Sequence, residues 1–435
     1  MRWRRLGVKH VLFPSSSSSL VTGVITLLGI AAVAGCTSAP ATTGTGTTTS
    51  VNTRGPITIG TSLSLTGNFS TDGVAFKRGY ELWVADVNAH GGVGGRQVKL
   101  TILDDGSSPD QVVANYQKLL GVDHVDMAFG PFSSVLTGPA SEVAGRFGMA
   151  LIEGAGGAPS VFDSPTNQAD HNVFDVSLPI ADEMDPLVSW IASLPSGQRP
   201  RSAAYPTVQD PFGEAPVQRA QALLQNVGVN TLYSQVFPET DSMLTTQADQ
   251  VAQSGAQLVV LGSTDVPTVA AFMREFERMH YRPKLFIAAA GPDQGTAFSG
   301  AVGLSNANGM MVPNGWYPGY ANADSGRVVA EYVRKYGGPA DGVNADVAEA
   351  YSVGEVAAQA IVATGGTDNA KIISYLHSGV RLTSVQGPVQ FDPLGENGAA
   401  AGFIFQWQSS SFNQVLPVNE AGSVPIIAAK PDWAH

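Results

Sequence analysis

The sequence predicts an α/β protein with two lobes, each built on a doubly wound parallel sheet. Short apolar strands alternate along the chain with segments of helical periodicity, the pattern of parallel strands with helices on both faces. We expect strands at residues 57–63, 97–103, 125–129, 149–152, 202–205, 231–236, 258–261 and 285–288. These units are too many for one compact sheet, and 435 residues exceed the size at which single cores usually divide. Two lobes are therefore expected.

The N-terminal segment predicts export. Residues 1–9 carry four basic side chains and no acid, and residues 20–33 are apolar, which is the layout of a secretory signal. The apolar run is short for a membrane-spanning helix, which needs about 20 such residues. The small residues before Cys36 resemble a bacterial lipobox, which implies removal of residues 1–35 and acylation of the Cys36 thiol. The chain would then be lipid-anchored to the outer face of the cytoplasmic membrane, with general and twin-arginine export both open.

Residues 36–55 predict a flexible linker, because they are rich in Thr, Ser, Ala, Gly and Pro and hold almost no bulky apolar side chain. Folding is expected to begin near Pro56. Removal of residues 1–35 takes away four of the 24 basic residues and none of the 36 acidic ones, which changes the formal net charge from −12 to −16. Such acidity argues against nucleic acid and an anionic membrane surface as partners. Cys36 is the only cysteine, so an intramolecular disulfide is excluded.

Local signals define the first two strand and helix units. Residues 57–63 read as a strand, and residues 74–88 carry apolar side chains at helical spacing. The second expected strand ends in Asp104 and Asp105, after which Ser108 offers an N-cap followed by a proline at the first helical position. We expect the two aspartates to orient the strand end and cap the next helix rather than to act as paired catalytic acids.

The motifs argue against an enzyme. The sequence has no H-E-x-x-H, no P-loop and no G-x-S-x-G, and its seven histidines are scattered. No metal site and no cofactor are therefore predicted. In doubly wound sheets ligands bind beyond the carboxyl ends of the strands, so the loops after the strands hold the candidate binding residues.

A series of motifs resembles the N-terminal signature of the leucine/isoleucine/valine-binding protein family, whose members are extracytoplasmic receptors of ABC transporters. The residues that carry the resemblance are Leu63-Ser64-Leu65-Thr66-Gly67, Gly73, Gly79, Asn88, Gly91-Gly92, Gly95-Arg96 and Asp104-Asp105, with a later anchor in Phe403-Ile404-Phe405-Gln406-Trp407. The resemblance implies a type I periplasmic binding protein fold, with two Rossmann-like doubly wound lobes joined by a three-strand hinge. The N-terminal lobe would hold residues 56–176 and 313–400, and the C-terminal lobe residues 177–312 and 401–430.

The resemblance also implies which residues bind a solute. Ser133 and Ser134 match the family's serine-rich carboxylate loop, although plain N-capping of the next helix explains Ser134 almost as well. Gly156 and Gly157 match the loop whose backbone approaches the ligand. Asp293 matches the acid that binds an ammonium group, with an ordinary surface turn as the alternative.

Other candidates come from their position in loops at strand ends. Thr264 and Asp265, which follow the expected strand at 258–261, are secondary candidates. Four aromatic residues are expected to wall a side-chain pocket, with core packing as the usual alternative. These aromatic residues are Phe69, Phe212, Trp316 and Tyr317.

Two departures from the family leave the ligand open. Phe212 stands where many relatives have a tyrosine, and Gly157 where relatives often have a threonine, so two hydroxyl groups are missing. The resemblance implies a monomeric receptor that captures a branched-chain or related amino acid by hinge closure and delivers it to an ABC permease. Amides and small carboxylates remain open as ligands. The alternative function is a ligand-sensing lipoprotein of the same fold that signals to a partner.

Overall fold

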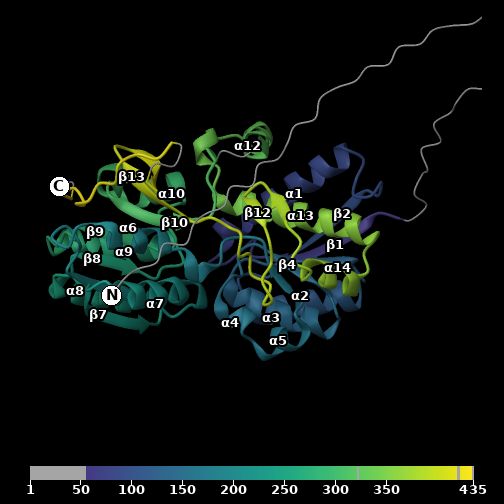
Figure 1. Ribbon diagram of the computed structural model, residues 1–435, viewed down its shortest axis with the longest axis horizontal. Coiled ribbons are helices and arrows are strands. Elements are labelled where there is room, and N and C mark those ends of the chain that lie inside the picture. The colour runs from purple at the N-terminus through teal and green to yellow at the C-terminus, as the bar shows by residue number, and fades with distance from the viewer. Residues whose placement is uncertain (1–54, 321–322, 419–421, 434–435) are drawn as a thin grey trace, which may run out of the picture. The chain divides into compact units, whose positions relative to one another are not determined.

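The computed structural model describes residues 55–320, 323–418 and 422–433 (Figure 1). The predicted signal peptide, Cys36 and nearly all of the predicted linker lie outside these residues. All eight expected strands are present, with ends that differ from the prediction by a few residues at most. Among the described helices, none has the length and apolar character that crossing a bilayer requires.

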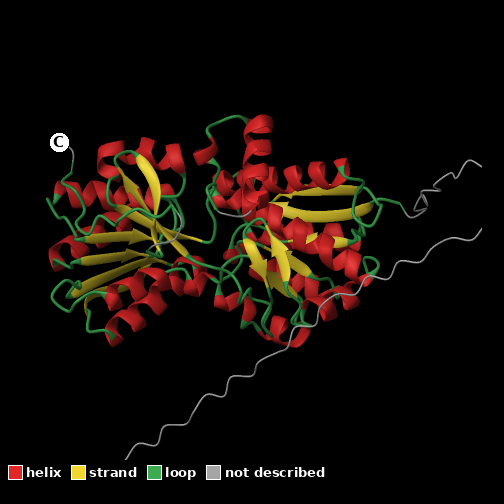
Figure 2. Cartoon of the chain, turned by 45° about the horizontal axis from the view of Figure 1, so that its top comes forward, coloured by secondary structure: helices red, strands yellow, loops and turns green. Residues whose placement is uncertain are grey.

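The first lobe is built on a parallel sheet. Its described strands have the order β2 (Val98–Asp104), β1 (Ile57–Leu63), β3 (Met127–Phe129), β4 (Leu151–Glu153) and β5 (Val173–Asp175). The helices between these strands are α1 (Ser70–Ala89), α2 (Pro109–Gly121), α3 (Ser134–Arg146), α4 (Pro159–Phe162) and α5 (Pro165–Asp170). Figure 2 shows helices on both faces of the strands, as the alternation predicts.

The second lobe is built on a mixed sheet. Its described strands have the order β14 (Ser411–Leu416), β13 (Phe403–Gln408), β10 (Met310–Asn314), β9 (Leu285–Ala288), β8 (Leu258–Leu261), β6 (Ser202–Val208) and β7 (Asn230–Phe237). β13 runs antiparallel to both of its neighbours, and the other pairs are parallel. The helices that accompany it are η1 (Ile180–Asp182), α6 (Asp185–Ser193), α7 (Pro211–Asn226), α8 (Asp241–Ser254), α9 (Val266–Arg278), α10 (Gly295–Val302) and α11 (Leu304–Ala307).

The chain passes between the lobes three times. It leaves the first sheet after β5, returns after β10, and leaves again before β13. The returning segment adds elements to the first lobe. Their apolar side chains pack in the same hydrophobic core as those of β1 and α1. These elements are α12 (Ala323–Tyr336), η2 (Ala340–Gly342), α13 (Ala345–Thr364), α14 (Asn369–Leu376), β11 (Leu382–Ser384) and β12 (Gly387–Val389).

Two glycines let α1 and α13 pack closely. A Cβ atom on Gly79 of α1 would lie 2.4 Å from the carbonyl oxygen of Val347. A Cβ atom on Gly354 of α13 would lie 2.1 Å from the Trp83 ring. This close contact matters because the first turns of both helices point acids toward the space between the lobes, as described below.

The expected start of α2 is confirmed. The Ser108 side chain accepts a hydrogen bond from the Gln111 N–H, with Pro109 at the first helical position. Asp104 accepts hydrogen bonds from the loop after β1, including the Leu65 N–H at 3.0 Å, and Asp105 accepts from the Ser64 hydroxyl at 2.7 Å. The two aspartates therefore hold the strand end and its neighbouring loop.

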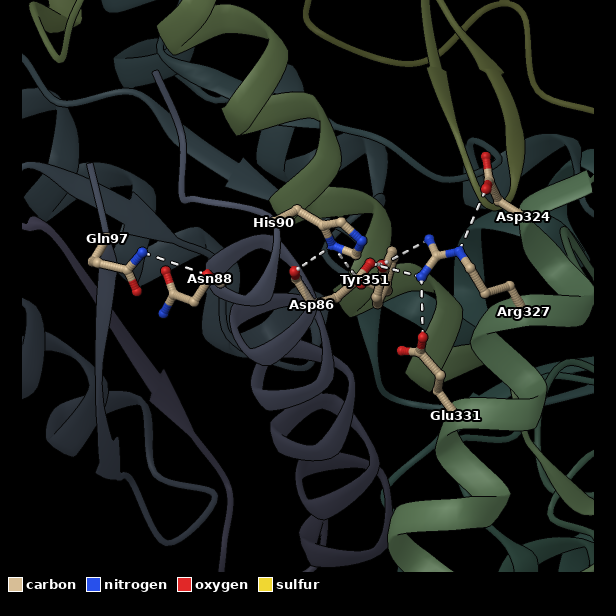
Figure 3. A network of polar contacts seen from close by, with 8 residues as sticks. All are labelled: Asp86, Asn88, His90, Gln97, Asp324, Arg327, Glu331 and Tyr351. Carbon is tan, nitrogen blue, oxygen red and sulfur yellow. Dashed lines mark hydrogen bonds and ion pairs between the residues drawn. The ribbon is translucent and has the colours of Figure 1, made fainter. Parts of the chain in front are cut away.

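A polar network joins α1, α12 and α13 (Figure 3). Arg327 of α12 donates to the Asp86 carboxylate at 2.7 Å and to the Tyr351 hydroxyl at 3.1 Å. Tyr351 in turn donates to Asp86. Glu331 lies 3.6 Å from the same guanidinium group. We call Asp86, Arg327, Glu331 and Tyr351 the Asp86 network; in it a cation of the chain compensates a largely buried acid.

Candidate functional site

A cavity lies at the carboxyl ends of strands from both sheets. The first lobe contributes Gly154, which follows β4, and Asp175, which ends β5. The second lobe contributes Ala289, which follows β9, and Asn314, which ends β10. The cavity has a volume of about 70 Å³, which is room for roughly five water molecules. This is the position at which doubly wound sheets bind ligands.

Five of the residues singled out from the sequence line this cavity. They are Phe69, Ser133, Phe212, Thr264 and Asp293. The Phe69 ring packs against Phe132, another lining residue, with 6.0 Å between ring centroids. The structure thus brings together side chains from four loops and Phe212, which lies in the first turn of α7.

The carboxylate-loop candidates that do not line the cavity are engaged elsewhere. The Ser134 hydroxyl accepts a hydrogen bond from the Ala158 N–H at 3.2 Å. A Cβ atom on Gly156 would lie 2.4 Å from the Thr137 hydroxyl, and one on Gly157 would lie 2.4 Å from an Asp175 carboxylate oxygen. These glycines permit close packing beside the cavity.

Two aromatic candidates and one acid also lie away from the lining. Trp316 is buried in the core of the first lobe, with 2% of its surface exposed. Tyr317 packs against Phe405 of β13, with 5.3 Å between ring centroids. Asp265 caps α9 by accepting a hydrogen bond from the Thr268 N–H at 2.9 Å.

Acids dominate the polar lining of the cavity, and sequence reasoning found only one of them. Six carboxyl groups reach the cavity, and no Lys, Arg or His is among the described residues that line it. We call these six the cavity acids: Asp72, Asp175, Glu183, Asp293, Asp346 and Glu349. In the described residues no group of three or more His, Cys, Asp or Glu has the arrangement of a metal site.

The cavity acids hold their protons more tightly than ordinary carboxyl groups. Burial, with the nearby Asp293 as the second cause, raises the pKa of Asp72 to about 7. Burial also raises the pKa of Glu183, Asp346 and Glu349 well above the usual range, and for these three the other cavity acids are a further cause. Uncompensated negative charge is unfavourable in this space, so protons neutralise part of it.

A contact between the lobes uses one of these acids. The Gln294 side-chain amide, in the loop before α10, donates to the Asp72 carboxylate at 2.6 Å. Asp346, at the start of α13, is also near Asp72, and the charge of Asp72 is a cause, after burial, of the raised pKa of Asp346.

A buried carboxylate occupies backbone donors at the edge of the cavity. Glu153 ends β4 and is fully buried. One of its carboxylate oxygens accepts hydrogen bonds from the Ala155 N–H at 2.8 Å and from the Gly156 N–H. Its other oxygen accepts none from the described residues. Burial raises the pKa of Glu153 to about 7.

Comparisons with known proteins agree with this architecture. A sequence model of the family described as periplasmic binding protein matches residues 56–411. The chain belongs to the periplasmic binding protein family. The family implies an exported protein, and the resemblance to leucine/isoleucine/valine-binding proteins is confirmed. A curated relative, Leu/Ile/Val-binding protein homolog 7 of Brucella abortus, is 23% identical over 378 residues, which cover 83% of this chain and 91% of the relative.

Solved structures of similar proteins show the same fold. An ABC transporter solute-binding protein of R. palustris in complex with benzoate aligns with a TM-score of 0.70 at 16% identity, over 87% of this chain and 98% of the other. A branched-chain amino acid transporter substrate-binding protein of Streptococcus pneumoniae in complex with isoleucine aligns with a TM-score of 0.67 at 16% identity, over 82% and 97%. The type I fold with two lobes is therefore established. The homologues are solute-binding proteins rather than enzymes.

Proposed function

We propose that this periplasmic binding protein captures a small solute by closure of its two lobes and delivers it to an ABC permease. The observation that carries the proposal is the cavity at the strand ends, whose lining comes from both lobes. The hydrogen bond between Gln294 and Asp72 supports it, because that contact exists only when the lobes approach each other. The proposal includes no turnover of the solute.

The three chain crossings supply the hinge. The lobes, taken as residues 56–176 with 313–400 and residues 177–312 with 401–430, would move as units about these crossings. In the open form the solute would contact Phe69, Ser133 and the acids of the first lobe. Closure would then add Phe212, Thr264 and Asp293 from the second lobe and exclude water.

A lipid on Cys36 would keep the receptor near its permease. The composition of residues 36–55 supports a flexible tether of the kind that raises the effective concentration of one tethered partner at another. Replacement of Cys36 by alanine should release or misprocess the protein and leave solute binding by the folded lobes intact.

The test combines thermal unfolding, small-angle scattering and uptake. A panel of amino acids, amides, amines and small carboxylates is added to the protein; a bound solute should raise the melting temperature with concentration and reduce the radius of gyration. Asp293→Ala should lose most of the affinity. Cells that lack the protein should fail to accumulate the bound solute. If no member of the panel changes either the melting temperature or the scattering, the proposal is wrong.

A further inference from the structure

We infer that Glu153 is a positioning residue for solute binding: its buried carboxylate holds the loop at residues 154–157 in the arrangement that forms one wall of the cavity. The inference rests on the proposed function and adds a residue that does not itself line the cavity. Three observations carry it: the hydrogen bonds that Glu153 accepts, the space that its neighbours leave for it, and the acceptor that the loop presents.

Glu153 fixes the loop through two successive peptide groups. Its Oε2 atom accepts hydrogen bonds from the Ala155 N–H at 2.8 Å and from the Gly156 N–H. Gly154 and Ala155 line the cavity, so the two peptide groups that Glu153 holds belong to the cavity wall. Hydrogen bonds to a carboxylate are stronger than those between neutral groups. Because each peptide group is planar, two such bonds set the orientation of both planes.

Two glycines leave room for the acid and for the loop. Gly130 directly follows β3, and a Cβ atom there would lie 2.2 Å from the Glu153 Cβ atom. A Cβ atom on Gly156 would lie 2.4 Å from the Thr137 hydroxyl oxygen of α3. The first glycine makes space for the Glu153 side chain, and the second lets the loop lie against α3. A larger residue at either position would displace the acid or the loop.

The stability of the fold gives no reason for an acid at this position. Glu153 is fully buried, and its Oε1 atom accepts no hydrogen bond from the described residues. Its register neighbour on β5 is a second buried acid, Asp175. Burial of a carboxylate without a compensating cation is unfavourable. A residue that is unfavourable for stability is expected where function requires it.

The loop that Glu153 holds presents an acceptor to the cavity. In a trans peptide group the C=O bond points opposite to the N–H bond of the same plane. The Ala155 carbonyl shares its plane with the Gly156 N–H and therefore points away from Glu153. Its oxygen accepts no hydrogen bond from the described residues, whereas the Gly154 carbonyl accepts from the Ser177 hydroxyl at 2.8 Å. Ala155 thus offers a solute a fixed acceptor, and Glu153 sets its direction.

The experiment compares replacements of Glu153 that remove or keep its acceptor. Glu153→Met has a similar length and no acceptor, and should weaken binding by about tenfold or more. Glu153→Gln keeps an oxygen that can accept both N–H groups and should bind within about threefold of the wild type. Calorimetry uses the standard L-amino acids, acetamide, 1,4-diaminobutane and benzoate as probes. Dissociation constants are compared for each probe that binds the wild-type protein.

Hydrogen exchange of the loop gives a measurement that does not depend on a solute. The Ala155 and Gly156 amides should exchange faster in Glu153→Met than in the wild type, and Glu153→Gln should restore slow exchange. A side chain needed only for folding would instead lower the melting temperature and leave the affinity of the folded protein unchanged.

Glu355 offers a matched control. It is a partly buried acid of α13 outside this cavity, and it accepts a hydrogen bond from the Val385 N–H at 2.7 Å. Glu355→Met should speed exchange of the Val385 amide and leave the affinity for every probe unchanged. If Glu153→Met does not fold, Glu153→Asp replaces it, because the shorter side chain draws the carboxylate back from both N–H groups. It should weaken binding to a similar extent.

The outcomes separate the inference from the proposed function. If Glu153→Met binds as tightly as the wild type, or if its loop amides exchange no faster, the inference is wrong and solute capture stands. A loss of affinity in Glu153→Gln as large as that in Glu153→Met also overturns it, because the charge of Glu153 rather than its hold on the loop would then matter. Failure of every probe to bind the wild-type protein overturns both.

Discussion

The Asp86 network and the cavity acids differ in how the negative charge of their carboxyl groups is compensated. In the Asp86 network, Arg327 and Tyr351 both donate to the acid, so a cation of the chain compensates its charge (Figure 3). In the cavity, six carboxyl groups face one another without a lining Lys, Arg or His among the described residues. A compensated acid holds helices together, whereas uncompensated acids must be neutralised by protons or by a ligand. We therefore assign the Asp86 network to the stability of the fold and the cavity acids to the binding site.

The largest expected effect is a pH dependence of stability that comes from the cavity acids. Their pKa values are raised in the folded protein, Asp72 to about 7. Between about pH 4 and 7 the folded state therefore binds more protons than the unfolded state, and the free energy of unfolding falls as pH rises. We expect a loss of several kcal/mol between pH 5 and 8 without added solute. Denaturant titrations across this range measure it, and a flat or rising profile would contradict the comparison.

The next effect should come from the Asp86 network. Arg327→Met removes the cation, keeps most of the apolar stem and leaves a largely buried acid with Tyr351 as its donor. We expect a loss of about 2 kcal/mol in the free energy of unfolding, since Arg327 is itself partly exposed. Solute affinity should not change. A measurable loss of affinity in this variant would show that the two groups of acids are coupled.

Removal of an acid from the cavity should have the opposite sign. Asp346→Asn removes a buried carboxyl group whose pKa is raised by burial and by the charge of the nearby Asp72. At pH 8 we expect the protein without solute to gain about 1 kcal/mol, and at pH 5 to change little, because the acid is then already protonated. Chemical denaturation at the two pH values distinguishes these outcomes. Asp86→Asn is the matched change in the Asp86 network and should destabilise at both.

The sequence predicts features that depend on local pattern and leaves out those that depend on distant parts of the chain. Apolar runs predicted eight strands, including the three-residue β3 and β4, but they missed β5 and the longer β10, β13 and β14. Loops after strands predicted Ser133, Thr264 and Asp293 in the cavity lining, because parallel strands bring their carboxyl ends to one edge.

The acids that the sequence did not predict come mainly from helices. Asp72 lies in the first turn of α1. Asp346 lies in the first turn of α13, more than 270 residues later, and Glu349 follows one turn after it. No local signal joins these helices; Gly79 and Gly354 do so through packing that only the fold reveals. The only sequence feature that could have drawn attention to Asp72 is its neighbour Gly73, which belongs to the family signature. The role of Glu153 could not be predicted from the sequence either. Its hydrogen-bond donors are backbone N–H groups, and these do not depend on which residue types follow it.

The smallest expected effect tests which contact in the Asp86 network carries its stability. Glu331 lies 3.6 Å from the Arg327 guanidinium and is partly exposed, so water and salt screen the pair. Glu331→Gln should therefore change the free energy of unfolding by less than about 0.5 kcal/mol, against about 2 kcal/mol for Arg327→Met. Thermal and denaturant unfolding of the two variants at low and high salt make the comparison. If Glu331→Gln lowered the free energy of unfolding as much as Arg327→Met does, the sum of the charges around Arg327 would hold the three helices together. The direct hydrogen bond from Arg327 to Asp86 would then not be the main cause. The contrast with the cavity acids, which lack such a donor, would then lose its physical basis.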